Sequence, residues 1–279
     1  MRVNACIVAY DNPLVMLKAA VKSISQVHPS VLNTLYLIDN SSTERLRKHF
    51  EVTTHYLFND ENLGFGKANN IAMRHSIEDE VHYHLLVNPD VYFDEGVVEK
   101  MVDFMDENLD IGLIMPKVIY PDGNIQYLCK LLPTPLDLIG RRFFSWGPFK
   151  KYIDKRNELF ELHDLCYEKQ VDVPVLSGSF MLIRTSVLKE VGLFDERYFM
   201  YLEDFDLCRR IGEVSRTTYF PEVSVVHEYK KGSYFNRRLF KHHIISAIKY
   251  FNKWGWCFDK RRVVRNKMCL QELRDKKIM

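Results

Sequence analysis

The stretch that decides the fold opens with Val3-Asn-Ala-Cys-Ile-Val-Ala9, a short run of apolar and β-branched residues that predicts a strand. Residues 14–26 follow with apolar side chains at helical spacing, and Thr34-Leu-Tyr-Leu-Ile-Asp39 predicts a second strand. The alternation continues through a predicted strand, helix and strand over residues 55–58, 66–76 and 83–87. Such alternation predicts parallel strands joined by helical crossovers, and therefore an α/β fold.

The rest of the chain gives weaker signals for regular structure. Ser42 or Thr43 is expected to cap a helix over residues 44–49. Residues 129–170 contain three prolines and read as an irregular excursion from the sheet. Further helices are predicted over residues 93–107, 185–191 and 204–211, and further strands over residues 111–115, 171–176 and 217–227.

Length and composition limit the class of protein. The 279 residues suffice for one large domain or two small ones, and 47% hydrophobic with 27% charged residues is an ordinary globular balance. The six cysteines are scattered without a Cys-x-x-Cys pair, which argues against a structural zinc site. A net charge of +2 does not favour nucleic acid as a partner. Because the sequence shows neither a signal peptide nor an apolar run of membrane-spanning length, we expect a cytoplasmic location.

Basic and aromatic residues gather in the C-terminal part of the chain, over residues 237–277. One interpretation is a surface for anionic membranes, because cationic and aromatic side chains together suit a lipid headgroup region. The other is a helix that packs its aromatic residues on the core and leaves its basic face in water. The sequence leaves both interpretations open.

Polar residues occur at or just beyond the ends of the predicted strands. They are Asp39, Asn62, Asn88 and Asp90. Ligands of parallel sheets gather at the carboxyl ends of strands, so these positions predict a binding site there. In Asn88-Pro-Asp90 the proline ends the ladder and presents Asp90 on a loop, where its carboxylate can hold a divalent cation together with phosphate oxygens and water.

A second candidate is the glycine-containing segment Asn59-Asp-Glu-Asn-Leu-Gly-Phe-Gly-Lys-Ala-Asn-Asn70. Gly64 and Gly66 allow close approach of the backbone, and a helix beginning near Gly66 would point free N–H groups at an anion. The spacing fits neither Gly-x4-Gly-Lys-Ser/Thr nor Gly-x-Gly-x-x-Gly. The sequence therefore argues against an NTPase loop and against a dinucleotide-binding fingerprint.

The third candidate is Tyr198-Phe-Met-Tyr-Leu-Glu-Asp-Phe-Asp-Leu-Cys-Arg-Arg210, where three carboxylates stand in an apolar and aromatic run. Carboxylates in apolar surroundings are costly unless they are paired, so the cluster predicts acid–base or metal chemistry. The alternative is the acidic first turn of an amphipathic helix. Asp206, two residues after Asp204, would face away from it on a helix and is expected to be structural.

His227 ends the apolar run Val223-Ser-Val-Val-His227. A single histidine at a strand end is most often structural. Its imidazole can also complete a metal site with carboxylate and phosphate oxygens.

Taken in order, these motifs resemble those of the family 2 inverting glycosyltransferases of GT-A fold, and among them the rhamnosyltransferase-like subgroup that builds bacterial surface polysaccharides. The resemblance covers about residues 3–250. Its motifs are Val8-Ala-Tyr10, Asp39-Asn-Ser-Ser42, Asn62-Leu-Gly-Phe-Gly66 with Asn69-Asn70, Asn88-Pro-Asp90, Gly178-Ser-Phe-Met-Leu-Ile-Arg184, the acidic segment from Phe194 to Arg209, and His227. It implies a Rossmann-like, mostly parallel central sheet flanked by helices, with a C-terminal helical extension.

The resemblance implies a role for each group of residues. Those expected to bind the nucleotide sugar are Ala9, Tyr10, Asp39, Asn62, Gly64, Phe65, Asn69, Asn88 and Asp90. Asp39 would accept a hydrogen bond from the uracil or thymine ring. Asp90 would bind Mg²⁺ or Mn²⁺ bridging the diphosphate, and His227 matches a third metal ligand. Asp204 matches the general base, and Glu203 is the alternative base.

The implied reaction is a single displacement that inverts the anomeric carbon of a nucleoside-diphosphate sugar. The resemblance favours dTDP-rhamnose as donor, with a UDP-hexose as the alternative. The implied acceptor is a glycan or a lipid-diphosphate-linked glycan of surface polysaccharide such as O-antigen, reached at the inner face of the plasma membrane. The implied domains are a catalytic unit over residues 1–235, divided into 1–125 and 126–235, and a basic aromatic extension over 236–279.

Two other functions would be indicated by different sequence features. A sugar nucleotidyltransferase would carry a Gly-rich basic loop after the first strand, where this chain has Ala9-Tyr-Asp-Asn-Pro13. A non-catalytic carbohydrate- or membrane-binding module would have no need of Asp39, Asp90, Asp204 and His227 together.

Overall fold

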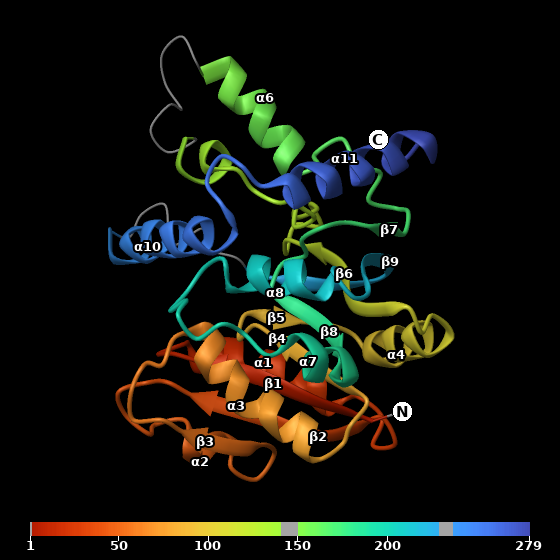
Figure 1. The fold of residues 1–279 in the computed structure, drawn as a ribbon. Helices are drawn as coiled ribbons and strands as arrows, with labels where there is room; N and C mark the ends of the chain where they lie inside the picture. The colour runs from red at the N-terminus through yellow and green to blue at the C-terminus, as the bar shows by residue number, and fades with distance from the viewer. Residues whose placement is uncertain (1, 141–149, 229–236) are drawn as a thin grey trace.

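The computed structural model describes residues 2–140, 150–228 and 237–279. Within these ranges, nine strands form one sheet with helices on both sides (Figure 1). Eight strands follow the order β3-β2-β1-β4-β8-β6-β9-β5, and β7 pairs with β9.

The first half of the chain builds the parallel part of the sheet. Strand β1 pairs in parallel with β2 and β4, and β2 pairs in parallel with β3. These four strands are β1 (Val3–Ala9), β2 (Leu32–Asp39), β3 (His55–Phe58) and β4 (Tyr83–Val87). The helices between them are α1 (Leu14–Ser25), α2 (Arg47–Phe50) and α3 (Phe65–Glu78). The sequence prediction of parallel strands with helical crossovers is confirmed.

The second half of the chain continues the sheet with mixed directions. Strand β8 runs antiparallel to both β4 and β6, whereas β6 and β9 are parallel to each other. The strands are β5 (Val91–Tyr92), β6 (Ile111–Ile119), β7 (Val171–Asp172), β8 (Phe180–Arg184) and β9 (Arg216–His227). The helices are α4 (Val97–Glu107), η1 (Leu136–Gly140), α6 (Lys150–Phe160), α7 (Thr185–Val191), α8 (Glu203–Ile211), α10 (Arg237–Trp254) and α11 (Lys260–Asp275).

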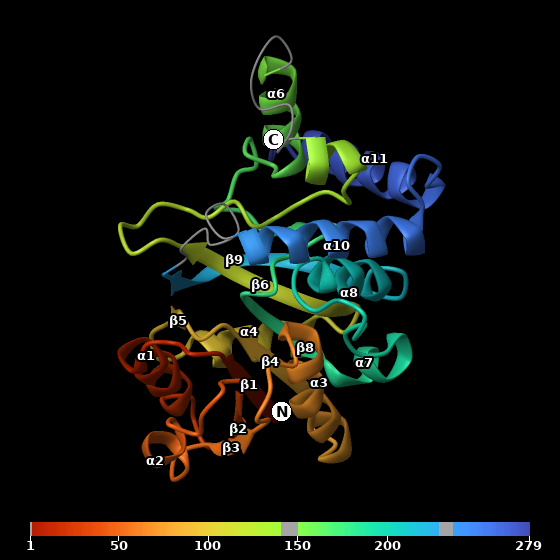
Figure 2. The same cartoon turned by 90° about the vertical axis from the view of Figure 1, so that its left-hand side faces the viewer.

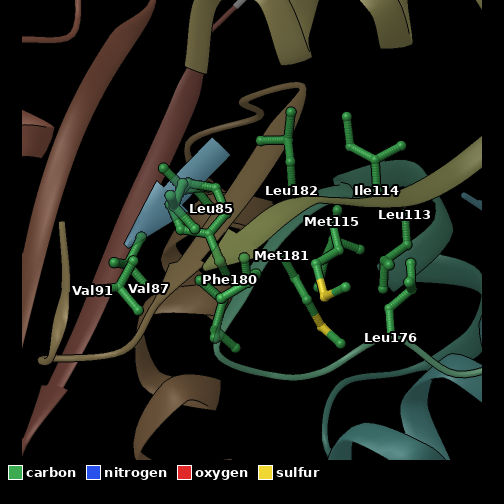
Figure 3. Close-up of a cluster of buried hydrophobic side chains, with 14 of the residues drawn as sticks. Leu85, Val87, Val91, Leu113, Ile114, Met115, Leu176, Phe180, Met181 and Leu182 are labelled. Atoms are coloured by element: carbon green, nitrogen blue, oxygen red, sulfur yellow. The ribbon is translucent and has the colours of Figure 1, made fainter. Parts of the chain in front are cut away.

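Alternation along the strands buries both faces of the sheet. On one face, Ala5 and Ile7 of β1 join a cluster with Leu17 and Ile24 of α1. On the other, a separate small cluster contains Cys6, Tyr36, Ile38, Ala68 and Ala72, the last two from α3. Farther along the sheet, side chains from β4, β6 and β8 meet in the buried cluster of Figure 3. Because both faces of the sheet are buried, the sheet holds the ends of its strands in fixed positions.

Several local predictions need correction. Neither Ser42 nor Thr43 caps a helix, because α2 begins later, at Arg47, without a side-chain cap. The strand predicted over residues 171–176 is only β7, two residues long. The helix predicted from residue 93 begins at Val97, after Gly96 adopts a left-handed conformation. The predicted irregular excursion over residues 129–170 contains η1 and α6, and its residues 141–149 lie outside the described part.

The C-terminal helices pack directly on α8, as Figure 2 shows for α10. The Trp254 indole donates to the Asp206 carboxylate at 2.8 Å. Buried Arg209 makes two hydrogen bonds to Asp259, at 2.6 and 2.8 Å, and its guanidinium lies 4.2 Å from the centroid of the Trp254 ring. Tyr250 is also fully buried. For these side chains, the interpretation of a helix packed on the core is the correct one.

Among the described residues, no helix combines the length and the apolar character that crossing a membrane requires.

Candidate active site

Asp39 lies at the carboxyl end of β2 and is fully buried. Its Oδ2 accepts a hydrogen bond from the Tyr56 hydroxyl, and its Oδ1 accepts one from the backbone N–H of Ser41 at 2.9 Å. Burial, and after it the hydrogen bond to Asp39, raises the pKa of Tyr56, so the hydroxyl stays protonated as a donor. Each carboxylate oxygen has two lone pairs, so these bonds still leave acceptor capacity for a ligand.

The expected nucleotide-binding residues differ in how far they reach the surface. Tyr10 follows β1 and is 45% exposed, whereas Ala9 is fully buried opposite Asp39 in the β1–β2 register. Asn69 is fully buried inside α3, where its amide donates to the carbonyl of Phe65 at 3.0 Å. The Tyr10 side chain is therefore accessible to a ligand, whereas those of Ala9 and Asn69 lie in the interior.

The segment Asn62-Leu-Gly-Phe65 is held in one shape before α3 begins. The Asn62 side chain accepts a hydrogen bond from the Gly64 N–H at 3.0 Å, and Asn40 donates to the Gly64 carbonyl at 3.2 Å. Gly64 has φ +79°, and a Cβ there would lie 2.2 Å from the Phe199 carbonyl oxygen. Only glycine fits this position, because any side chain would meet both backbone strain and a collision.

Three segments that are far apart in the sequence meet beside this loop. The Asn88 N–H, just after β4, donates to the Ser179 carbonyl at 2.9 Å. The N–H of Gly178, the residue before Ser179, donates to Asp204 Oδ2 at 3.1 Å. A Cβ on Gly178 would lie 3.3 Å from the Asp204 Cβ and 3.5 Å from the Phe65 ring. The structure thus brings the predicted residues Phe65, Asn88 and Asp204 to one place.

Asp204 and Glu203 differ in their surroundings. Asp204 is half-buried and accepts hydrogen bonds from the N–H groups of Gly178 and Phe205. Burial raises its pKa, and these hydrogen bonds and the charge of Lys130 oppose that rise. Glu203 is 5% exposed, and burial, followed by the neighbouring Asp204 charge, raises its pKa to about 8. Asp204 is therefore the better placed of the two to accept a proton from a ligand.

An unusual backbone turn sets where α8 begins. Tyr201 and Leu202 both have positive φ, 70° and 67°, a conformation that non-glycine residues rarely adopt. The turn places Glu203 and Asp204 in the first helical turn. Behind them, Asp206 is fully buried and receives contacts from Arg210, Lys253 and Trp254. The expected structural role of Asp206 agrees with these contacts.

Asp90 and His227 meet where β5 pairs with the end of β9. Val91 is opposite His227 in that register, and Asp90 Oδ1 lies 3.3 Å from His227 Nε2. On the other side of the ring, Nδ1 lies 3.0 Å from the amide oxygen of Gln126. The two predicted metal ligands are therefore neighbours in space, although 137 positions separate them in the sequence.

These two residues fit a divalent cation in chemistry and in position. Asp90 Oδ1 is buried and receives no hydrogen bond from any residue that the structure describes. The carboxylate oxygen and the imidazole nitrogen lie 3.3 Å apart, and both are ligands that Mg²⁺ or Mn²⁺ accepts. Within the described ranges, no cluster of three or more His, Cys, Asp or Glu side chains occurs.

Sequence reasoning missed several residues that hold the site together. Tyr56 donates to Asp39, Gln126 contacts His227, and Gly178 supplies an N–H to Asp204. The charge of Lys130 opposes the rise in the Asp204 pKa that burial causes. Gly178 belongs to the motif Gly178–Arg184, which the family resemblance includes without implying a role for this glycine. No spacing rule connects the other three to their partners, because each contact crosses between elements.

The overall shape matches solved glycosyltransferases. The crystal structure of GalNAc-T7 with UDP, GalNAc and Mn²⁺ superposes with a TM-score of 0.61 at 16% identity, covering 82% of this chain and 43% of that one. The structure of S. aureus TarS 1–349 in complex with UDP-GlcNAc gives a TM-score of 0.56 at 15% identity, covering 90% of this chain and 67% of that one. The fold is therefore GT-A, as the sequence predicted.

The sequence itself matches the family described as glycosyl transferase family 2 over residues 5–192, and the chain belongs to that family. It is 31% identical over 177 residues to the N-acetylglucosaminyl-diphospho-decaprenol L-rhamnosyltransferase of Mycobacterium tuberculosis, covering 60% of this chain and 56% of that protein. It is 28% identical over 197 residues to the rhamnosyltransferase WbbL of Escherichia coli K12, covering 67% and 69%. The match therefore spans little more than half of the M. tuberculosis protein. The predicted kinship with rhamnosyltransferase-like members of the family is confirmed.

Proposed function

We propose that the protein is an inverting glycosyltransferase that moves a sugar from a nucleoside diphosphate to a hydroxyl of a glycan or of a lipid-diphosphate-linked glycan. The observation that carries this proposal is the meeting of Asp204 with the segments of Phe65 and Asn88. Asn88 is two residues before Asp90, which lies beside His227. One carboxylate is then available for the acceptor hydroxyl, and one pair of ligands for the leaving diphosphate.

In this proposal Asp204 is the general base. Its Oδ2 accepts a hydrogen bond from the Gly178 N–H and its Oδ1 accepts one from the Phe205 N–H, and these two bonds restrict rotation of the carboxylate. The acceptor hydroxyl gives its proton to Asp204 as its oxygen attacks the anomeric carbon from the face opposite the diphosphate. The raised pKa of Asp204 makes it a stronger base than an exposed aspartate.

Asp90 and His227 would hold a divalent cation at the opposite end of the reacting bond. A bound Mg²⁺ or Mn²⁺ stabilises the negative charge that develops on the departing nucleoside diphosphate. The backbone N–H of Asn88, two residues before Asp90, donates to the Ser179 carbonyl, and we assign this contact to positioning the loop.

We assign Glu203 no direct contact with the acceptor. Its side chain is buried, and with a pKa of about 8 it is mostly protonated at neutral pH. A protonated carboxyl cannot serve as a base. Glu203 is therefore a weaker candidate than Asp204 for the general base. Its charge state affects chiefly the stability of the fold.

For the donor we propose dTDP-rhamnose, with UDP-hexoses as the alternative. The similarity to two rhamnosyltransferases supports the sugar, and the M. tuberculosis relative's name supports a lipid-diphosphate-linked acceptor. The residues of the proposed nucleotide site include the exposed Tyr10 and Asp39 with its remaining lone pairs. A panel of sugar nucleotides in a thermal-shift assay tests this, because a bound donor raises Tm according to its concentration and Kd.

The sharpest test of the proposed base is Asp204→Asn. We expect it to lower kcat by about 10²-fold or more while the Kd for the donor nucleotide, measured by calorimetry, stays within about twofold. Glu203→Gln is the matched carboxyl-to-amide control one position away, and it should retain most of the activity. Full activity in Asp204→Asn, or an equal loss in Glu203→Gln, would contradict the assignment.

Chelation tests the proposed cation. Exhaustive EDTA treatment should abolish transfer, and added Mg²⁺ or Mn²⁺ should restore it. Asp90→Asn should weaken Mn²⁺ binding in the presence of dTDP, as measured by electron paramagnetic resonance. Undiminished transfer after chelation would remove Asp90 and His227 from this role.

A further inference from the structure

Gln126 makes two contacts to one residue. It follows a turn in which the Tyr120 N–H donates a hydrogen bond to the Asn124 carbonyl. Gln126 is almost completely buried, at 3% exposed. Its amide nitrogen donates to the backbone carbonyl of His227 at 2.8 Å, and its amide oxygen lies 3.0 Å from His227 Nδ1. The segment after β6 thereby contacts both the backbone and the ring of the residue that ends β9.

The first of these contacts fixes the orientation of the amide. A backbone carbonyl only accepts hydrogen bonds, so the group of Gln126 that faces it must be the NH₂. The amide oxygen is then the group that faces Nδ1, and because this oxygen also only accepts, Nδ1 must carry the proton. In the neutral imidazole, the lone pair is consequently on Nε2, the nitrogen 3.3 Å from Asp90 Oδ1.

We propose that Gln126 is a positioning residue that selects the Nδ1–H tautomer of His227, so that the Nε2 lone pair and Asp90 Oδ1 face one divalent cation. This inference rests on the proposed function of the Asp90–His227 pair. It adds the reason why the imidazole presents Nε2 and not Nδ1. An outer hydrogen bond of this kind orients a metal-ligating histidine and typically changes metal affinity by about 10–100-fold.

The chemistry of the glutamine suits this task. A neutral amide supplies a donor and an acceptor together, and no other neutral side chain of similar length can contact both the carbonyl and Nδ1. Gln126→Met keeps the length and removes both hydrogen bonds. Gln126→Glu keeps an acceptor opposite Nδ1, adds a negative charge, and loses the donor to the backbone carbonyls of His227 and Ile119.

The tautomer can be observed directly by two-bond ¹H–¹⁵N correlation spectra of the ¹⁵N-histidine-labelled protein, with the His227 signal assigned from its loss in His227→Asn. We expect the Nδ1–H pattern in the wild-type protein and in Gln126→Glu. In Gln126→Met we expect a shift toward the Nε2–H pattern. Wild-type protein with the proton on Nε2 would overturn the inference.

Metal binding gives the second readout, with Mn²⁺ and dTDP as the probe in electron paramagnetic resonance. Gln126→Met should bind Mn²⁺ about tenfold or more weakly than the wild-type protein, and Gln126→Glu should bind it more tightly than Gln126→Met does. Gln26→Met, at an exposed position after α1, is the matched control and should bind as the wild-type protein does.

The possible results distinguish a failure of the positioning role of Gln126 from a failure of the proposed metal site. If the wild-type protein binds Mn²⁺ and a folded Gln126→Met binds it equally well, Gln126 has no positioning role and the proposed metal site stands. If the wild-type protein binds no Mn²⁺ in the presence of dTDP, the metal site itself fails, and this inference fails with it. Near-ultraviolet circular dichroism and Tm establish that the variant is folded. If Gln126→Met does not fold, the spectrum of Gln126→Glu and that of the wild-type protein decide the tautomer.

Discussion

At the scale of single residues, the site depends on carboxylates whose surroundings differ although they are neighbours in sequence. Asp204 receives two backbone N–H groups, Glu203 lies in the interior, and Asp206 is bonded by cationic and indole donors. The sequence predicted the cluster and its position at the start of a helix. It could not predict which carboxylate is paired, because the partners come from residues 178, 253 and 254.

Glu203 makes the stability of the protein depend on pH. Its pKa rises from the ordinary 4.5 to about 8 in the folded state, so the folded protein binds more protons than the unfolded chain between these pH values. The free energy of unfolding therefore falls as the pH rises through this window. Glu203→Gln removes the effect, and we expect its Tm to exceed that of the wild-type protein at pH 8 and to approach it at pH 5.

Differential scanning calorimetry at the two pH values checks this prediction. Each kcal/mol of added stability should raise Tm by about 2–4 °C in a domain of this size. Glu190→Gln, on the exposed face of α7, is a control that should show no such dependence on pH. A Tm difference between Glu203→Gln and wild type that is the same at pH 5 and pH 8 would contradict the raised pKa.

At the scale of elements, the carboxyl ends of the parallel strands β1, β2 and β4 lie along one edge. Helix α8 is held by contacts to α10 and to Asp259, which caps α11. The ends of the parallel strands were predictable because a run of β-branched residues closed by a polar one marks such an end. The contact between α8 and the C-terminal helices was not predictable, because it depends on Arg209 and Asp259 meeting in the interior at 1% and 3% side-chain exposure.

Asp259→Asn should destabilise the protein strongly. The substitution keeps a side chain that can cap α11, where Asp259 accepts from the Arg262 N–H, but it leaves the buried Arg209 without a counter-charge. Breaking one partner of a buried ion pair costs about 3–5 kcal/mol. Urea denaturation measures this change in the free energy of unfolding.

Arg261→Met is the matched control, because it removes the exposed ion pair to Glu213 that links the same two regions. Exposed pairs contribute about 0–1 kcal/mol, so its midpoint in urea should barely change. Equal destabilisation by the two variants would show that the buried pair does not hold α8 in place.

At the scale of the whole molecule, α6 and α11 lie at the end farthest from β1, β2 and β3, as Figures 1 and 2 both show. On α11, Val263, Val264 and Met268 are 61, 55 and 66% exposed beside the exposed Lys260 and Lys267. Phe258, just before the helix, is 98% exposed. We propose that these residues contact an anionic lipid surface, as the composition of residues 237–277 suggested. The segment Arg141-Arg-Phe-Phe-Ser-Trp146 lies outside the described residues.

Vesicle flotation tests this surface with intact protein. Deleting the C-terminal helices would also remove the supports of α8, so point substitutions are the better design. The wild-type protein should float with vesicles containing phosphatidylglycerol, and the double variant Val264→Glu, Met268→Glu should float substantially less. Val52→Glu, at an exposed apolar position near α2, should float as the wild-type protein does. Equal flotation of the double variant would exclude α11 from membrane contact.

The sequence by itself determined the α/β architecture, the strand ends that carry Asp39, Asn88 and Asp90, and the family. These depend on local periodicity and on short motifs, which the order of residues preserves. The tertiary structure alone decided that β8 runs antiparallel, that Asp204 rather than Glu203 faces the meeting point of the loops, and that Gln126 contacts His227. The physical reason is that burial, pairing of charges and the choice of tautomer depend on contacts between elements distant in the chain, and local sequence does not specify those contacts.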